Sequence, residues 1–171
     1  MEIILLGENS PDNETWLADV ESELADDFAA VHVQYFENRT EGGRIDMNSE
    51  HEKLVATAQD CDHAYAICAK SAGVILTLDA MQANDIRPQR CVFVGAPIGA
   101  SAADRFDNFR TPTLFIQHTH DPVRPAQKLK NVLKNHNVRQ YAFKEVSGNT
   151  DVYADTKKLA AYTKEFLNSL D

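Results

Sequence analysis

The hydrophobic pattern of the chain alternates between short apolar runs of strand length and longer apolar stretches with helical spacing. The run Ala64–Ala69 (AYAICA) contains no charged residue, as is typical of a strand covered on both faces. The stretch Ala72–Met81 that follows is apolar, rich in helix formers and too long for a strand. Between Trp16 and Phe28, apolar residues recur every four positions. That spacing predicts a helix with one face toward the core.

The same alternation continues along the chain and predicts six strands separated by helices. The strands are expected over Glu2–Leu6, Ala30–Phe36, Ala64–Ala69, Arg90–Ala96, Pro112–Gln117 and Gln140–Val146. The first helix is expected to begin at a cap at Ser10, with Pro11 in its first turn, and the second at a capping box of Ser49 and Glu52. Two more helices are expected over Ala72–Met81 and Arg124–Asn135, and the last after a cap at Asp155 or Thr156. This order predicts an α/β three-layer sandwich with an open, mostly parallel six-stranded sheet.

Length and composition indicate one ordinary globular domain over residues 1–171. The hydrophobic fraction is 43% and the charged fraction is 25%, both typical of a soluble domain. The net charge is −9, and residues 1–60 hold fifteen acidic residues against three basic ones. Such a surface repels phosphate backbones and anionic lipid, so neither nucleic acid nor membrane is an expected partner. The opening apolar run stops at Gly7, so no signal peptide or membrane span is expected.

The sequence predicts no metal and no cofactor. The three cysteines, Cys61, Cys68 and Cys91, are odd in number and have no paired spacing, which disfavours a disulfide framework or a zinc site and favours a cytoplasmic protein. His118 and His120 are the only close histidine pair, and two ligands do not complete a site. The loop after the first strand lacks a glycine-rich phosphate-binding pattern.

Ser71 stands between the predicted central strand and the apolar helix, in Ala69-Lys70-Ser71-Ala72-Gly73. Small residues two positions before and after a serine allow a sharp backbone turn, which lifts the hydroxyl out at the carboxyl end of the sheet. This pattern is typical of a nucleophile elbow. The alternative is an ordinary strand-to-helix turn in which Ser71 only caps the helix. Lys70 is no obvious partner for the serine, because neighbouring residues in a tight turn point apart.

The segment from Phe109 to Pro125 (FRTPTLFIQHTHDPVRP) has a buried strand followed by Asp121 and Pro-Val-x-Pro. It resembles the acid-bearing loop of the α/β-hydrolase superfamily. The order of Ser71 and then Asp121 agrees with that family's order of serine, acid and histidine. The resemblance covers nearly the whole chain, in a short form without an inserted lid domain. It implies a minimal α/β-hydrolase fold.

The resemblance also implies a mechanism and a substrate class. Ser71 would attack the carbonyl of a small ester or amide substrate, and Asp121 would orient a histidine base. The oxyanion would lie between the N–H of Ala72 and one from the loop at Glu8 and Asn9. The residues expected around the substrate are Gly7, Glu8, Asn9, Lys70 and Ala72.

The sequence departs from the family at the general base. The segment Ser147–Tyr153 (SGNTDVY) carries Asp151 where the family has histidine, and no histidine follows His136. His118 or His120 would then serve as a displaced base, or Asp121 and Asp151 would share a proton or bind a cation. A third interpretation is a catalytically impaired relative that keeps the fold as a binding module. A flavodoxin-like ligand-binding domain is a further alternative, distinguished by a cofactor contact at the first loop.

Overall fold

The computed structural model describes residues 1–7, 12–37, 45–107 and 109–169. The described strands form one sheet in the order β2-β1-β3-β4-β5-β6, and every neighbouring pair is parallel. The strands are β1 (Glu2–Leu6), β2 (Val31–Gln34), β3 (Tyr65–Lys70), β4 (Arg90–Val94), β5 (Thr113–His118) and β6 (Tyr141–Val146). The predicted six-stranded sheet is therefore confirmed, and it is parallel throughout.

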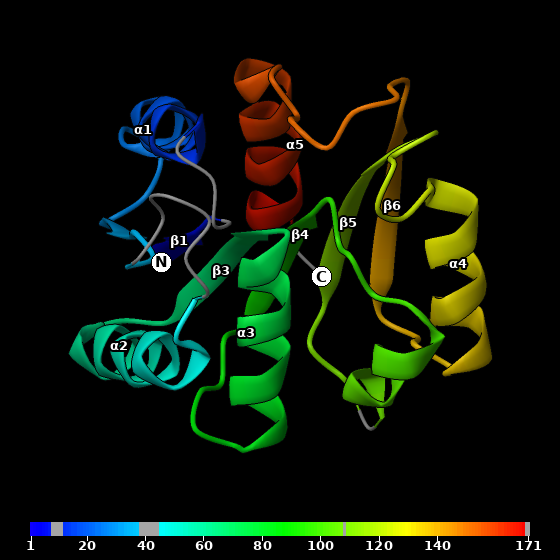
Figure 1. Cartoon of the computed structure of the whole chain (residues 1–171). Helices are drawn as coiled ribbons and strands as arrows, with labels where there is room; N and C mark the ends of the chain where they lie inside the picture. Colours follow the sequence, from blue (N-terminus) through cyan, green and yellow to red (C-terminus); the bar gives the residue numbers. More distant parts are fainter. Residues whose placement is uncertain (8–11, 38–44, 108, 170–171) are drawn as a thin grey trace.

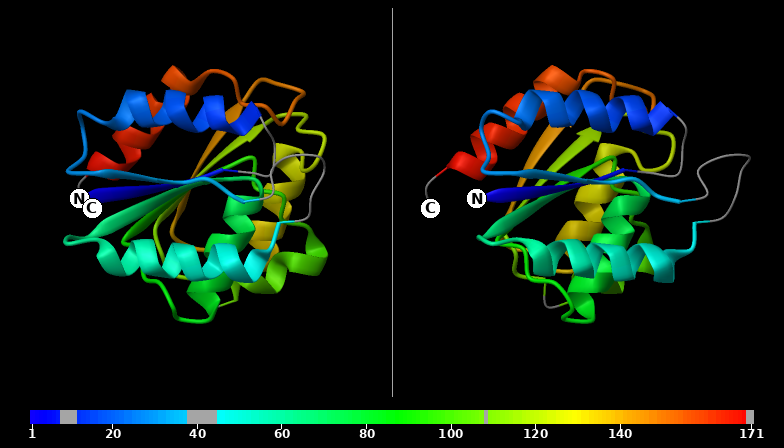
Figure 2. Two further views of the ribbon diagram at one scale, coloured as in Figure 1. Left: turned by 60° about the vertical axis from the view of Figure 1, so that its left-hand side comes forward. Right: turned by 90° about the vertical axis from the view of Figure 1, so that its left-hand side faces the viewer.

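Helices cover both faces of this sheet (Figures 1 and 2). They are α1 (Asp12–Leu24), α2 (Met47–Asp60), α3 (Ala72–Gln82), the 3-10 helix η1 (Ala100–Phe106), α4 (Ala126–Asn135) and α5 (Thr156–Asn168). Helices α1 and α5 lie side by side on one face, and α2, α3 and α4 lie on the other. None of these helices, taken over the described residues, combines the length and the apolarity needed to cross a membrane.

The core forms on both sides of the sheet because successive strand residues point to opposite faces. In β3, Ala66 and Cys68 pack with α1 and α5, whereas Ile67 and Ala69 pack with the helices of the other face. All four side chains are fully buried. This explains why the sequence of β3 reads as an unbroken apolar run, and it confirms that this strand is covered on both faces.

Helix α2 corrects one prediction. It begins at Met47, and its cap is Asp46, whose carboxylate accepts hydrogen bonds from the N–H groups of Asn48 and Ser49. Ser49 therefore lies inside the first turn, and the predicted capping box of Ser49 and Glu52 is wrong. The reason is that an upstream aspartate caps a helix as well as a serine does. At α5, Asp155 is the cap and accepts from the N–H of Lys158. The predicted cap at Ser10 lies outside the described residues.

Candidate functional site

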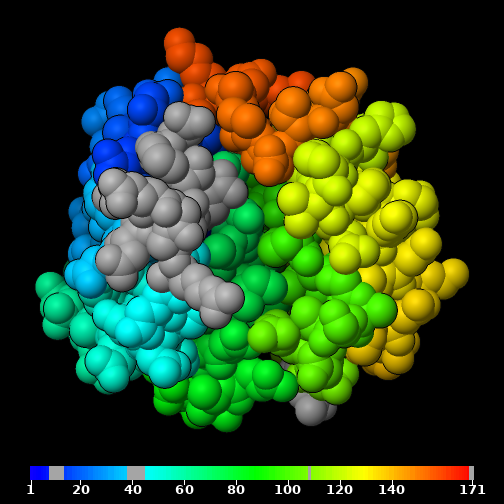
Figure 3. Space-filling model, in the orientation of Figure 1, coloured from blue at the N-terminus to red at the C-terminus, as the bar shows by residue number. Residues whose placement is uncertain are grey.

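The carboxyl ends of parallel strands meet at one edge of a sheet, where ligands bind in open α/β folds. Here that edge carries Gly7 after β1, Ser71 after β3, Gly95 after β4, Asp121 after β5 and Tyr153 after β6. The loops after β5 and β6 are joined by hydrogen bonds from the backbone N–H groups of Thr119 and His120 to the carbonyls of Val146 and Gly148. These two loops also lie side by side in the space-filling view, in yellow-green and orange (Figure 3).

Ser71 has a backbone conformation that non-glycine residues rarely adopt. Its φ is +50° and its ψ is −114°, so the residue carries local strain of about 1–3 kcal/mol. Its N–H donates to the carbonyl of Val94 over 3.1 Å, which ties the turn to the end of β4. The side chain is half-buried and makes no capping hydrogen bond to α3. The alternative interpretation of Ser71 as a helix cap is therefore not supported.

The sharp turn at Ser71 depends on the glycine two positions later. The N–H of Gly73 donates to the carbonyl oxygen of Gly7 over 3.1 Å. A Cβ atom on Gly73 would lie 2.8 Å from that oxygen and 2.9 Å from the Cβ of Leu6. Only glycine lets the start of α3 approach the end of β1 this closely. Gly7 therefore supports the turn through its backbone.

The other residues expected around the substrate lie in different surroundings. Ala72 opens α3, and the first N–H groups of a helix have no acceptor within the helix. Lys70 is buried, with its ammonium group 5.4 Å from the centre of the Trp16 ring. Its side chain therefore packs against α1. Glu8 and Asn9 lie outside the described residues.

Asp121 is buried, with 1% of its surface exposed. Its Oδ1 accepts from the N–H groups of Val123 and Arg124 over 2.8 and 2.9 Å. Its Oδ2 accepts from the hydroxyl of Tyr153 over 2.8 Å. Three donors therefore face the carboxylate. The structure gives both oxygens partners, and Asp151 is not among them.

Tyr153 is the residue at this edge that the sequence analysis missed. It is buried and adopts a positive φ of 53°. Its hydroxyl also accepts from the backbone N–H of His118 over 3.0 Å. Burial raises the pKa of the Tyr153 phenol well above its ordinary value, and the hydrogen bond to Asp121 raises it further. The hydroxyl therefore stays protonated and donates to Asp121.

Contacts with three neighbouring residues hold Tyr153 and its ring in place. It stacks on the ring of His118 with 4.0 Å between the ring centres. The carbonyl of Tyr153 accepts from the indole N–H of Trp16 over 3.2 Å. Gly95 has a φ of +56°, and a Cβ atom there would lie 2.7 Å from Cε2 of Tyr153. The ring therefore packs against the end of β4, next to the strand residue that accepts from Ser71.

The candidate bases take other partners. The Nδ1 of His118 lies 2.6 Å from the carbonyl oxygen of Thr150, and a carbonyl only accepts, so this nitrogen carries the proton. The side chains of His120 and Asp151 are exposed. Within the described residues, no histidine nitrogen forms a hydrogen bond with the hydroxyl of Ser71. The described part of this edge also contains no group of three metal-ligating side chains.

Neither a protein-family model nor a curated protein sequence matches the chain. Solved structures do resemble it. Est1E from Butyrivibrio proteoclasticus, solved with ferulic acid bound, is 13% identical with a TM-score of 0.74, over 97% of this chain and 87% of that one. The Pyrococcus furiosus esterase Pf2001 is 12% identical with a TM-score of 0.75, over 97% and 79%. A monoacylglycerol lipase from Paleococcus ferrophilus is 8% identical with a TM-score of 0.77, over 97% and 93%.

These likenesses extend over nearly the whole chain at low sequence identity. They agree with the all-parallel sheet covered by helices on both faces. The chain therefore has the α/β-hydrolase fold.

Proposed function

We propose that this chain is a serine hydrolase that acts on small ester or amide substrates, with Ser71 as its nucleophile. The observation that carries the proposal is the backbone of Ser71, held at a φ of +50° in a turn between β3 and α3. Strained conformations of this kind persist where the surrounding structure enforces them, and they cluster at active sites. The resemblance to two esterases and a lipase supports the same class of reaction.

The chemistry follows from the position of the serine at the start of a helix. Oγ of Ser71 attacks the carbonyl carbon, and the oxygen that becomes negative is stabilised by the N–H of Ala72. Collapse of this adduct breaks the bond to the alcohol or amine, which leaves with a proton from solvent, and water then hydrolyses the acyl-serine. The hydroxyl proton passes to solvent, because no described histidine is bonded to it. A positioned general base typically accelerates such a reaction by about 10²–10⁴-fold, and Ser71 lacks this contribution. We therefore expect slow turnover.

The test is hydrolysis of a short-chain nitrophenyl ester by the unaltered chain and four purified variants. Ser71→Ala is expected to reduce the rate to that of buffer alone, because the nucleophile is gone. His118→Ala and His120→Ala are each expected to change kcat by less than about tenfold, well below the loss of a working base. Ser147→Ala, an exposed serine after β6, is the matched control and should leave the rate unchanged. Equal rates for Ser71→Ala and the unaltered chain would refute the proposal.

A second candidate function is a binding protein that keeps the fold without catalysis. The specific observation in its favour is that Asp121, which would orient a histidine base, is bonded to Tyr153 and two backbone N–H groups. The same assay separates the two candidates. A non-catalytic binding protein shows no ester hydrolysis above buffer and no dependence on Ser71.

A further inference from the structure

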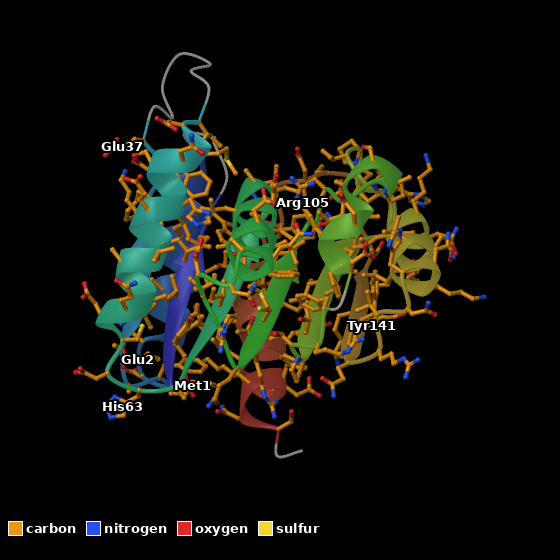
Figure 4. All side chains as sticks on the ribbon, turned by 90° about the horizontal axis from the view of Figure 1, so that it is seen from below. Met1, Glu2, Glu37, His63, Arg105 and Tyr141 are labelled. Carbon is orange, nitrogen blue, oxygen red and sulfur yellow. The ribbon has the colours of Figure 1, made fainter. Side chains whose placement is uncertain are left out.

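Three side chains that can bind a metal meet at the amino end of the sheet, at the opposite end of the strands from Ser71. They are Glu2, His32 and Cys61, and one ligand atom from each lies within 4.8 Å of the other two. We propose that this cluster, with His63 as the fourth ligand, is a site for a divalent transition metal ion such as Zn²⁺. Figure 4 shows Glu2 and His63 together at one end of the molecule and Glu37 at the other. The proposal does not depend on the proposed function.

The fold assembles the cluster from segments that are far apart in the sequence. Glu2 is the first residue of β1, and His32 lies in the neighbouring β2. Cys61 ends α2, and His63 follows in the connection to β3. The N–H of Glu2 donates to the carbonyl of Ala64 over 3.0 Å, which brings that connection against β1. The ligands therefore do not form a local spacing motif.

The distances fit a tetrahedral site after a small adjustment. Ligands about 2.0–2.3 Å from Zn²⁺ in a tetrahedron are roughly 3.3–3.8 Å from one another. Nδ1 of His63 is already 3.3 Å from Oε1 of Glu2. Nε2 of His32 is 2.6 Å from Oε2, the other carboxylate oxygen of Glu2. With one of these oxygens as the ligand, His32 must move away by about 0.7–1.2 Å, and the exposed His63 must turn to join the three-residue cluster. The histidine side chains are 32% and 69% exposed, so both can adjust and a metal can enter.

The donor set favours zinc over calcium or magnesium. One carboxylate, two imidazoles and one thiolate are ligands of borderline or soft metals, whereas calcium and magnesium prefer oxygen alone. The carboxylate of Glu2 is buried, and acidic residues flank Cys61 on both sides, at Asp60 and Asp62. The local charge is therefore negative, which favours a bound cation.

Binding has a defined proton balance. The Cys61 thiol donates to the carbonyl of Thr57 over 3.4 Å. On binding, the thiol releases its proton to solvent and its sulfur becomes a metal ligand. The hydrogen bond between His32 and Glu2 is replaced by two bonds to the metal. The bound ion would join β1, β2 and the α2–β3 connection, so its role is structural.

The test uses untagged protein, stripped with a chelator and then titrated with Zn²⁺ or Co²⁺. We expect one metal per chain by elemental analysis and a thiolate-to-cobalt charge-transfer band. Cys61→Ser should abolish that band and weaken zinc binding by more than about 100-fold, since loss of even an outer-shell partner costs 10–100-fold. His51→Ala is the matched control, because His51 pairs with Asp85 at 2.7 Å without belonging to the cluster. This variant should bind metal like the unaltered chain.

A second measurement needs no variant. Zinc should protect Cys61 from alkylation in the native protein, and mass spectrometry of the digested chain reads this directly. Failure to bind zinc, binding that Cys61→Ser leaves unchanged, or alkylation of Cys61 at the same rate with and without zinc would each overturn the proposal. Labelling of Ser71 reports on the opposite edge of the sheet, so the two proposals fail independently.

Discussion

Replacing Tyr153 with phenylalanine is expected to lower the free energy of unfolding by about 2–6 kcal/mol, because it leaves two polar groups without their hydrogen-bond partner at about 1–3 kcal/mol each. The lost hydroxyl donates to Oδ2 of Asp121 and accepts from the N–H of His118. The ring remains, so its packing on His118 and Gly95 is kept. The measurement is equilibrium unfolding by urea at neutral pH.

Tyr162→Phe is the matched control for this substitution. Tyr162 is half-buried in α5, with the ammonium group of Lys144 4.9 Å from its ring centre. Its hydroxyl makes no hydrogen bond with the described residues. The expected change is within about 0.5 kcal/mol. If Tyr153→Phe destabilised the protein no more than Tyr162→Phe, the Tyr153–Asp121 bond would have no structural role.

Replacing Gly73 with alanine is expected to destabilise the protein by about 1–3 kcal/mol, the usual cost of overpacking. This sign is opposite to the gain of about 0.5–1 kcal/mol that alanine normally brings to a helix. The new Cβ would lie 2.8 Å from the carbonyl oxygen of Gly7 and 2.9 Å from the Cβ of Leu6. Backbone at the end of β1 cannot move aside as a long side chain can. The start of α3, and with it Ser71, must shift.

Thermal unfolding measures this effect, and the neighbouring Ala72→Gly supplies the comparison. That variant adds no atom, and it should cost no more than about 1 kcal/mol. Gly73→Ala should also reduce the reactivity of Ser71, since the turn that presents the hydroxyl is displaced. A Gly73→Ala variant more stable than the unaltered chain would contradict the described contact between α3 and β1.

The fold could be predicted from the sequence because each strand is buried on both faces or lies beside a helix with regular apolar spacing. The turn at Ser71 could also be predicted from the sequence. The small residue at Gly73 is needed locally, because a larger side chain there would collide with the end of β1. The cap of α2 was not, because Asp46 and Ser49 are both good caps and only the path of the chain selects between them.

The partner of Asp121 could not be predicted for a different reason. The Tyr153 side chain is directed toward Asp121 by a loop backbone with positive φ. A loop conformation of that kind produces no periodic pattern of apolar residues in the sequence. The sequence does contain this aromatic residue, two positions after the polar segment 147–151. The cluster of Glu2, His32 and Cys61 was likewise hidden, since strand pairing and not sequence spacing brings its members together. The prediction that the chain binds no metal rested only on the spacing of cysteine and histidine residues along the sequence.

The most direct test of the central claim is covalent labelling with a fluorophosphonate probe, followed by mass spectrometry of the digested protein. A serine held in an active-site elbow reacts with such a probe, slowly where no histidine base activates it, whereas an ordinary surface serine does not. We predict a single adduct, on Ser71, that is absent from Ser71→Ala and kept in Ser147→Ala. An unlabelled chain, or an adduct on another residue with Ser71 unmodified, would contradict the assignment of Ser71 as the nucleophile.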